Sequence, residues 1–340
     1  MRFRIVAACG LAGVMLGSPR ASYAQQPGSA GAAHVADDPD SESSYLRAVA
    51  AQKRAKGVND ASVAEALIDL AIFYDAHGKM DLEIAALREA QGVFERVPQV
   101  DRNHYGGCLN RLATLLVDRD DFDGAEPLFV AAAAQYDRIT GPKSVGAAFA
   151  RANAGMILER QRDFRGAESL LEAARAKFEA TVGPNDPQIA VALNHLAALY
   201  GAHDAVRAEA TYRQLIAVHE HDGDAVALAV AVNDLATLHT NQGQWLLAEQ
   251  ELKRALNILE TSKQIESAPG VKILTTFATL ELKRGDFRSA RSMAERAEAI
   301  AEAKLEPNNA ERGYAALILA GIYKAAGEYR RAEALYLRAE

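Results

Sequence analysis

Two eight-residue stretches decide the fold of this chain: LNHLAALY at 193–200 and VNDLATLH at 232–239. Each carries a small residue, Ala197 or Ala236, at the same place in a run of apolar side chains. That small residue, called position +0, recurs with steps of 42, 42, 42, 39, 42 and 42 residues. A period in this range is typical of a repeat array, in which short units stack and share one core. The +0 residues are Ala71, Ala113, Gly155, Ala197, Ala236, Ala278 and Ala320.

Further positions of each unit indicate two helices joined by a turn. A turn residue, often Gly, stands at +7, a large apolar residue at +9, Ala at +12, a large residue at +16 and Ala again at +19. Because +9, +12, +16 and +19 are three or four residues apart, they share one face of an α-helix. The pattern predicts an all-α solenoid of seven antiparallel helix pairs. A lone helix over 42–55 is expected to cap the first pair.

Two local expectations follow from this register. Trp245 occupies +9, so we expect it to fill a wedge in the core, and Trp245→Ala to cost about 3–5 kcal/mol. The fourth unit has one residue fewer in its turn, and we expect the same hairpin there with a tighter turn.

The N-terminus is a separate segment. Residues 1–24 combine two early arginines, a short apolar run and Ser22-Tyr23-Ala24, which is typical of a secretory signal cleaved after Ala24. A lipoprotein signal ending at Cys9 is the less favoured alternative. Residues 25–40 are expected to be a disordered leader, and residues 41–340 to form the solenoid. Export predicts a periplasmic or secreted protein, and the alanine-rich composition suggests a bacterial one.

Charge and cysteine content narrow the possible partners. The formal net charge is −7 and no Lys/Arg cluster stands out, so nucleic acid and anionic membranes are poor candidates. Cys108 is the one cysteine left after cleavage, and a buried side chain is favoured over a reactive thiol. The segment His219–Asp224 is expected to be a solvated acidic loop rather than a metal site. No catalytic motif appears, and no cofactor is predicted.

The repeats resemble the tetratricopeptide repeat, in the longer form of kinesin light chains. The stretches 193–200 and 232–239 resemble that family's first helix, and GAEPLF at 124–129 and AEQEL at 248–252 resemble its second. The linker GPNDP at 183–187 is similar as well. The resemblance covers about residues 41–340. It implies a right-handed superhelix whose first helices line a concave groove for peptides or partner proteins, without catalysis.

Asparagine recurs three residues before +0, at Asn110, Asn194 and Asn233. Asn is a poor helix former, so we interpret the three as a polar ladder that pairs with the backbone of a ligand. The alternatives are hydrogen bonding between repeats, or a solvated neutral position. If the ladder serves a ligand, the three amides should have no partner within the fold. The other candidates for the groove are Arg111, Asn153, Arg160, His195, Asp234, Thr237 and Asn241.

The sequence therefore predicts an exported, non-enzymatic scaffold that binds a peptide or protein segment in its groove. The alternative is a structural or assembly protein that acts through the solenoid ends or the convex surface. An enzyme is the least favoured class. Leu335 and its neighbours, in the last predicted helix, are expected to lack a covering helix, which suggests self-association through the C-terminal end.

Overall fold

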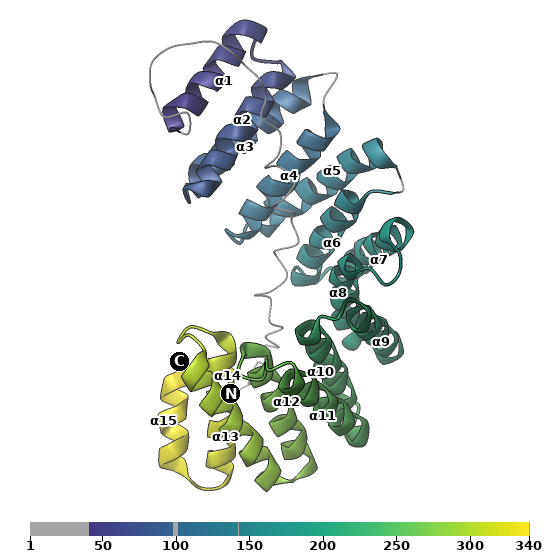
Figure 1. Ribbon diagram of the computed structural model, residues 1–340, viewed down its shortest axis with the longest axis vertical. Coiled ribbons are helices and arrows are strands. Elements are labelled where there is room, and N and C mark those ends of the chain that lie inside the picture. Colours follow the sequence, from purple (N-terminus) through teal and green to yellow (C-terminus); the bar gives the residue numbers. More distant parts are fainter. Residues whose placement is uncertain (1–40, 98–100, 142, 340) are drawn as a thin grey trace. The chain divides into compact units, whose positions relative to one another are not determined.

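The computed structural model describes residues 41–97, 101–141 and 143–339 (Figure 1). Throughout these ranges the regular structure is helical, without a strand, so the predicted all-α class is confirmed. The predicted signal peptide and leader, residues 1–24 and 25–40, lie outside the described residues. The chain divides into two compact units at Pro184 and Asn185, called here the N-terminal unit and the C-terminal unit.

The N-terminal unit consists of a lone helix followed by three hairpins. The lone helix, α1, packs on α2, which confirms the predicted capping helix. In each hairpin the first helix is even-numbered (α2, α4, α6) and the second is odd-numbered (α3, α5, α7). The bounds are α1 Glu42–Lys56, α2 Ala61–Ala76, α3 Met80–Arg96, α4 Arg102–Val117, α5 Phe122–Thr140, α6 Val145–Arg160 and α7 Phe164–Val182.

The C-terminal unit consists of four hairpins, each again an even-numbered first helix and an odd-numbered second helix. A short 3-10 turn, η1 Pro187–Ile189, leads into the first of them. The bounds are α8 Ala190–Gly201, α9 Ala205–Asp222, α10 Ala225–Asn241, α11 Trp245–Thr261, α12 Ala268–Arg284, α13 Phe287–Lys304, α14 Ala310–Ala325 and α15 Tyr329–Ala339.

The turn inside six of the seven hairpins is a helix C-cap with one left-handed residue at +7. The next backbone N–H then bonds back to the carbonyl five residues earlier, as from Gln244 to His239 at 2.9 Å, which is a Schellman motif. The left-handed residues are Gly78, Asp120, Arg162, Gly243, Gly285 and Gly327. The fourth hairpin lacks such a residue, and Asp204 N bonds to Tyr200 O, only four residues earlier. The tighter turn expected there is confirmed.

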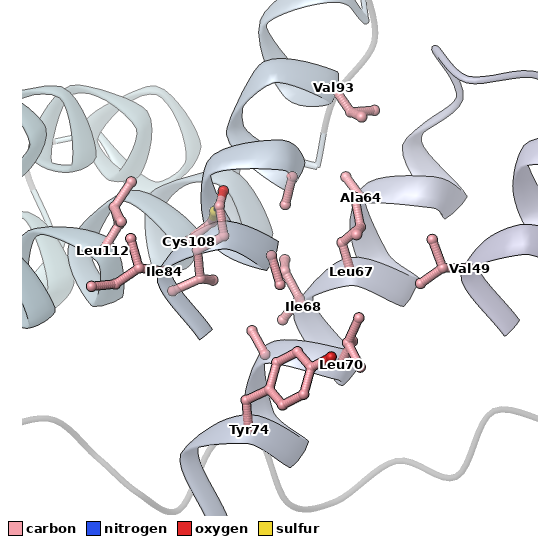
Figure 2. Close-up of a cluster of buried hydrophobic side chains, with 14 of the residues drawn as sticks. Val49, Ala64, Leu67, Ile68, Leu70, Tyr74, Ile84, Val93, Cys108 and Leu112 are labelled. Atoms are coloured by element: carbon pink, nitrogen blue, oxygen red, sulfur yellow. The ribbon is translucent and has the colours of Figure 1, made fainter. Parts of the chain in front are cut away.

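Small residues at +0 and +12 let the two helices of a hairpin approach closely. Position +0 is buried in all seven hairpins. A Cβ added to Gly155 would lie 2.8 Å from Leu171 Cγ on the partner helix, so no larger residue fits without a shift. Figure 2 shows the resulting core at the start of the N-terminal unit, where Val49, Leu67 and Ile84 come from three successive helices.

The large residue at +9 is not in the core. Trp245 is 42% exposed, Phe287 58% and Tyr329 69%, so the predicted core wedge at Trp245 is wrong. Each of these residues is the first of its helix. A helical side chain leans toward the N-terminus, so at the first residue it extends past the part of the helix that its partner covers.

Candidate functional site

The first helices of the C-terminal unit pack directly against one another. Helix α12 lies against α10 on one side and α14 on the other. Successive second helices of this unit do not pack together to a comparable extent. A stack bends toward the side on which its members are closer, so the first helices line the inner side of this unit. We call the solvent-exposed residues of α10, α12 and α14 on that side the inner face.

The inner face carries neutral, basic and apolar side chains. Thr237 and Asn241, both predicted site residues, are exposed on α10. Lys283 of α12 donates from Nζ to Asn241 Oδ1 at 3.1 Å and so joins two repeats. Tyr314 and Leu317 of α14 are each 44% exposed. Neither residue was predicted as a site residue from the sequence, although an apolar pair spaced by three residues on a first helix was a signal for them.

Asn233 does not fit the predicted ladder. Its side chain is fully buried, its Nδ2 donates to Asp234 Oδ1 at 3.1 Å, and its Oδ1 has no partner in the described part of the chain. Lys272 of α12 in turn pairs with Asp234 at 2.9 Å. The prediction of a free amide is therefore wrong at Asn233, because α12 packs directly on α10 and covers it. The contact between repeats at this place is made by Asp234 and Lys272, while the Asn233 side chain bonds within its own helix.

The remaining predicted amides are more accessible. Asn110 of α4, Asn153 of α6 and Asn194 of α8 are half-buried. Among the described residues, the side chains of Asn110 and Asn194 make no hydrogen bond. His195, next to Asn194 on α8, is also half-buried. A binding role for these four residues stays a prediction.

Arg111 has a structural role in the N-terminal unit. Its Nε donates to Glu83 Oε1 at 2.5 Å and its Nη2 to Asp75 Oδ1 at 2.7 Å, both in the preceding hairpin. Glu83 is buried at +12, where most other units have Ala, and burial raises its pKa although Arg111 opposes the shift. Arg160 places its guanidinium 5.1 Å from the ring centroid of Phe122. Both arginines are thus engaged within the fold.

The two reactive-residue hypotheses have clear outcomes. Cys108 is buried, its thiol contacts Leu87 O at 3.4 Å, and burial raises its pKa to about 12, which confirms an unreactive core cysteine. The prediction of a loop at His219–Asp224 is wrong over most of its length, because α9 continues to Asp222. His219 is buried in this last turn of the helix, where it contacts Asp222. No cluster of metal-ligating side chains occurs among the residues that the structure describes.

The last helix also differs from expectation. Leu335 is buried against α14, so the prediction that it lacks cover is wrong. Tyr336 and Leu337 of α15 are exposed instead, at 38% and 69%. None of the described helices combines the length and apolar character that crossing a bilayer requires.

Comparisons with known proteins agree with this architecture of stacked helix hairpins. Residues 107–180 match the tetratricopeptide repeat family. The same hairpin recurs on both sides of that match, so the described chain has the fold of stacked tetratricopeptide repeats throughout. A comparison with curated protein sequences gives no match.

Three solved structures illustrate the shared fold. BtubC (BKLC) from P. vanneervenii is 22% identical over 65% of this chain and 91% of its own, with a TM-score of 0.54. A tetratricopeptide repeat protein from Parabacteroides merdae is 15% identical over 81% and 91%, with a TM-score of 0.59. Aspartyl phosphate phosphatase F from Bacillus subtilis is 12% identical over 86% and 73%, with a TM-score of 0.57.

Proposed function

We propose that this protein is a non-enzymatic scaffold whose C-terminal unit holds a peptide or protein segment on the inner face. The observation that carries the proposal is the direct packing of α10, α12 and α14, which presents three first helices as one continuous surface. Thr237, Asn241 and Lys283 offer hydrogen-bonding groups there, while Tyr314 and Leu317 offer apolar area. Such a mixture suits a segment that supplies both backbone amides and apolar side chains.

Peptides selected from a random library against the full chain provide the test. Thr237→Arg and Gly321→Arg place a bulky side chain on the inner face, and each should weaken binding of an inner-face peptide by about tenfold or more. The Lys253 side chain is 65% exposed on the outer side of α11, and Lys253→Glu should leave the affinity unchanged. Binding that survives both inner-face changes, or a library without any binder, would contradict the proposal.

The two kinds of asparagine give a sharper contrast within the C-terminal unit. We propose that the bound segment extends from the inner face onto α8. Asn194→Ala should then weaken binding by about 1–3 kcal/mol with little change in melting temperature, because its amide makes no hydrogen bond among the described residues. Asn233→Ala should instead lower stability, since that side chain is buried between repeats. Equal effects of both changes on stability would argue that Asn194 contributes to the fold rather than to binding.

We also propose that the protein is exported and that residues 1–24 are removed. The charged start, the short apolar run and the Ser22-Tyr23-Ala24 site support this. The intact mass of the protein from its native host should correspond to a chain that begins at Gln25. A mass that includes residues 1–24 would refute cleavage.

A further inference from the structure

Exposed apolar side chains gather where the hairpins of the C-terminal unit turn. Val206 is 79% exposed and Leu246 73%, far more than the core positions of the same helices. All members of the set stand within the first three residues of a second helix. They are Val206 of α9, Trp245, Leu246 and Leu247 of α11, Phe287 of α13 and Tyr329 of α15. We call this set the C-terminal turn edge.

These side chains belong to one surface because each hairpin turns on the same side of the stack. Contacts between hairpins at the turns confirm the adjacency in three consecutive repeats. Arg284, at the end of α12, pairs with Glu249 of α11 at 2.6 Å. Arg291 of α13 pairs with Glu328, just before α15, at 2.7 Å. The apolar residues therefore form a row with one step per repeat, rather than scattered exposed positions.

The charge balance along this row is positive. Four of its acidic residues are occupied: Asp204 and Asp286 cap the helices that follow them, Glu328 pairs with Arg291 and Arg331, and Glu249 pairs with Lys253 and Arg284. A fifth, Glu333 of α15, is exposed beside Lys324 and Tyr329 and makes no ion pair among the described residues. Three cations make no ion pair within the described residues. These are Arg288 and Arg330, each the second residue of its helix, and Lys324 at the end of α14.

The start of α11 adds a local feature. Helices α9 and α13 each have an Asp that caps the first turn, whereas Gln244 before α11 makes no side-chain cap. Within the part of the chain that the structure describes, no side chain accepts a hydrogen bond from the backbone N–H groups of the first turn of α11, which lie beside Trp245, Leu246 and Leu247. A carboxylate from outside would find hydrogen-bond donors and the positive end of the helix dipole there.

We propose that the C-terminal turn edge is a second docking surface, distinct from the inner face, for an acidic protein segment that carries aliphatic or aromatic side chains. The unpaired cations and the uncapped helix start select carboxylates, and the row of apolar residues selects apolar side chains. Trp, Tyr and Arg are the residues that most often dominate the energy of protein interfaces. Two of the three unpaired cations are arginine, which favours a protein partner over a lipid surface.

The test selects short random peptides on the full chain and counter-selects on the variant Leu246→Asp/Leu247→Ser. Asp is favourable in the first turn of a helix, so this variant should fold normally. We expect the enriched peptides to be rich in Asp and Glu with interspersed Leu, Phe or Trp. Their affinity should fall about tenfold or more in the variant. It should also fall when salt is raised from about 0.05 to 0.3 M.

A matched control comes from the N-terminal unit. Leu82 of α3 is 43% exposed at the corresponding third position of its helix, and Leu82→Asp should leave the affinity unchanged. Arg288→Glu/Arg330→Glu should weaken binding about as much as the change at Leu246 and Leu247. Thr237→Arg on the inner face should have no effect on these peptides, so the outcome is independent of the proposed function.

Three outcomes would overturn the proposal. The enriched peptides could be neutral or basic, Leu82→Asp could weaken binding as much as Leu246→Asp/Leu247→Ser, or no peptide could distinguish the wild type from that variant. Binding of the protein to vesicles of phosphatidylcholine and phosphatidylglycerol is measured as a further test. Binding to them that is lost in Leu246→Asp/Leu247→Ser would assign the edge to a membrane instead.

Discussion

The N-terminal and C-terminal units are built from the same hairpin but differ at the turns. In the N-terminal unit the second residue of α3 and of α5 is an aspartate, Asp81 and Asp123. In the C-terminal unit the second residue of α9 and of α11 is apolar, Val206 and Leu246. The second residue of a helix has few contacts within its own hairpin. It can therefore change from acidic to apolar without a cost to the fold, which leaves it available for recognition.

The units also differ in how their first helices meet. Direct packing between first helices occurs in the C-terminal unit, whereas side chains such as Arg111 bridge α4 to α2 in the N-terminal unit. The position after +0 parallels this difference. It carries small residues in the C-terminal unit and mostly larger ones in the N-terminal unit. The residues are Ala198, Thr237, Thr279 and Gly321 against Ile72, Thr114 and Met156.

The largest expected effect tests whether both units share one register. Leu171 and Leu252 occupy +16 in different units, and both are fully buried. Either one changed to Ala should lower the stability of its own unit by about 2–5 kcal/mol, measured by native-state hydrogen exchange. Leu246→Ala, at an exposed position, should change it by less than about 0.5 kcal/mol. A neutral result at Leu171 or Leu252 would show that the register of that unit is wrong.

A smaller effect concerns the charged bridge found in the N-terminal unit. Arg111→Met leaves the buried Glu83 carboxylate without a cation, which should cost about 1–3 kcal/mol at neutral pH. Burial raises the pKa of Glu83, so the folded state binds a proton more readily than the unfolded state, and stability falls as pH rises through that pKa. Without Arg111 the pKa rises further, and the loss should be greater at high pH than at low pH.

The control for this prediction is the double change Glu83→Gln/Arg111→Met. Because glutamine does not ionise, the extra pH dependence should disappear in urea titrations at several pH values. If Arg111→Met shows the same loss at all pH values, the bridge contributes by packing rather than by charge.

The hairpin turns give a third effect, of about 1 kcal/mol. Position +7 is left-handed in both units, but two hairpins of the N-terminal unit place Asp120 and Arg162 there instead of Gly. Arg162→Gly should therefore raise stability by about 1 kcal/mol, since only Gly adopts this conformation without strain. Gly243→Arg should lower it by a similar amount. If thermal melts show that the melting temperatures of both variants shift in the same direction, the proposed strain at position +7 would be contradicted.

The smallest effect separates the exposed row from the core. Trp245→Ala should lower stability by no more than about 1 kcal/mol, because the ring is half-exposed at the start of α11. Phe178→Ala should lower stability by about 3–5 kcal/mol, because the buried Phe178 ring packs edge-on against Phe149, with 4.9 Å between the ring centroids. If the two changes cost the same in chemical denaturation, Trp245 would be a core residue after all.

Periodicity predicted the fold well because the same pattern of small and large residues recurs in several units of the chain. The +0 and +12 positions, the left-handed turn and the shortened fourth turn all followed from spacing alone. Burial at helix ends did not follow. Spacing placed Trp245 on the correct face, but only the lean of its side chain toward the N-terminus shows that it leaves the core.

The candidate site was less predictable for a related reason. Asn194 and Asn233 hold equivalent positions in the repeat, yet one is half-buried and the other fully buried. The difference depends on how closely the next first helix approaches, which depends on contacts between residues about 38 apart, such as Lys272 with Asp234. The sequence also shows that Glu83 replaces the usual Ala at +12. Its partner Arg111, however, could be identified only from the structure.

We propose, above all, that the C-terminal unit is the part of this scaffold that holds a protein segment. Hydrogen–deuterium exchange of the full chain, with and without a library-selected peptide, tests it most directly. We expect slower exchange in α10, α12 and α14 for inner-face peptides, and in the first turns of α11 and α13 for acidic peptides. Protection confined to the N-terminal unit, or to the outer surfaces of the second helices, would contradict it.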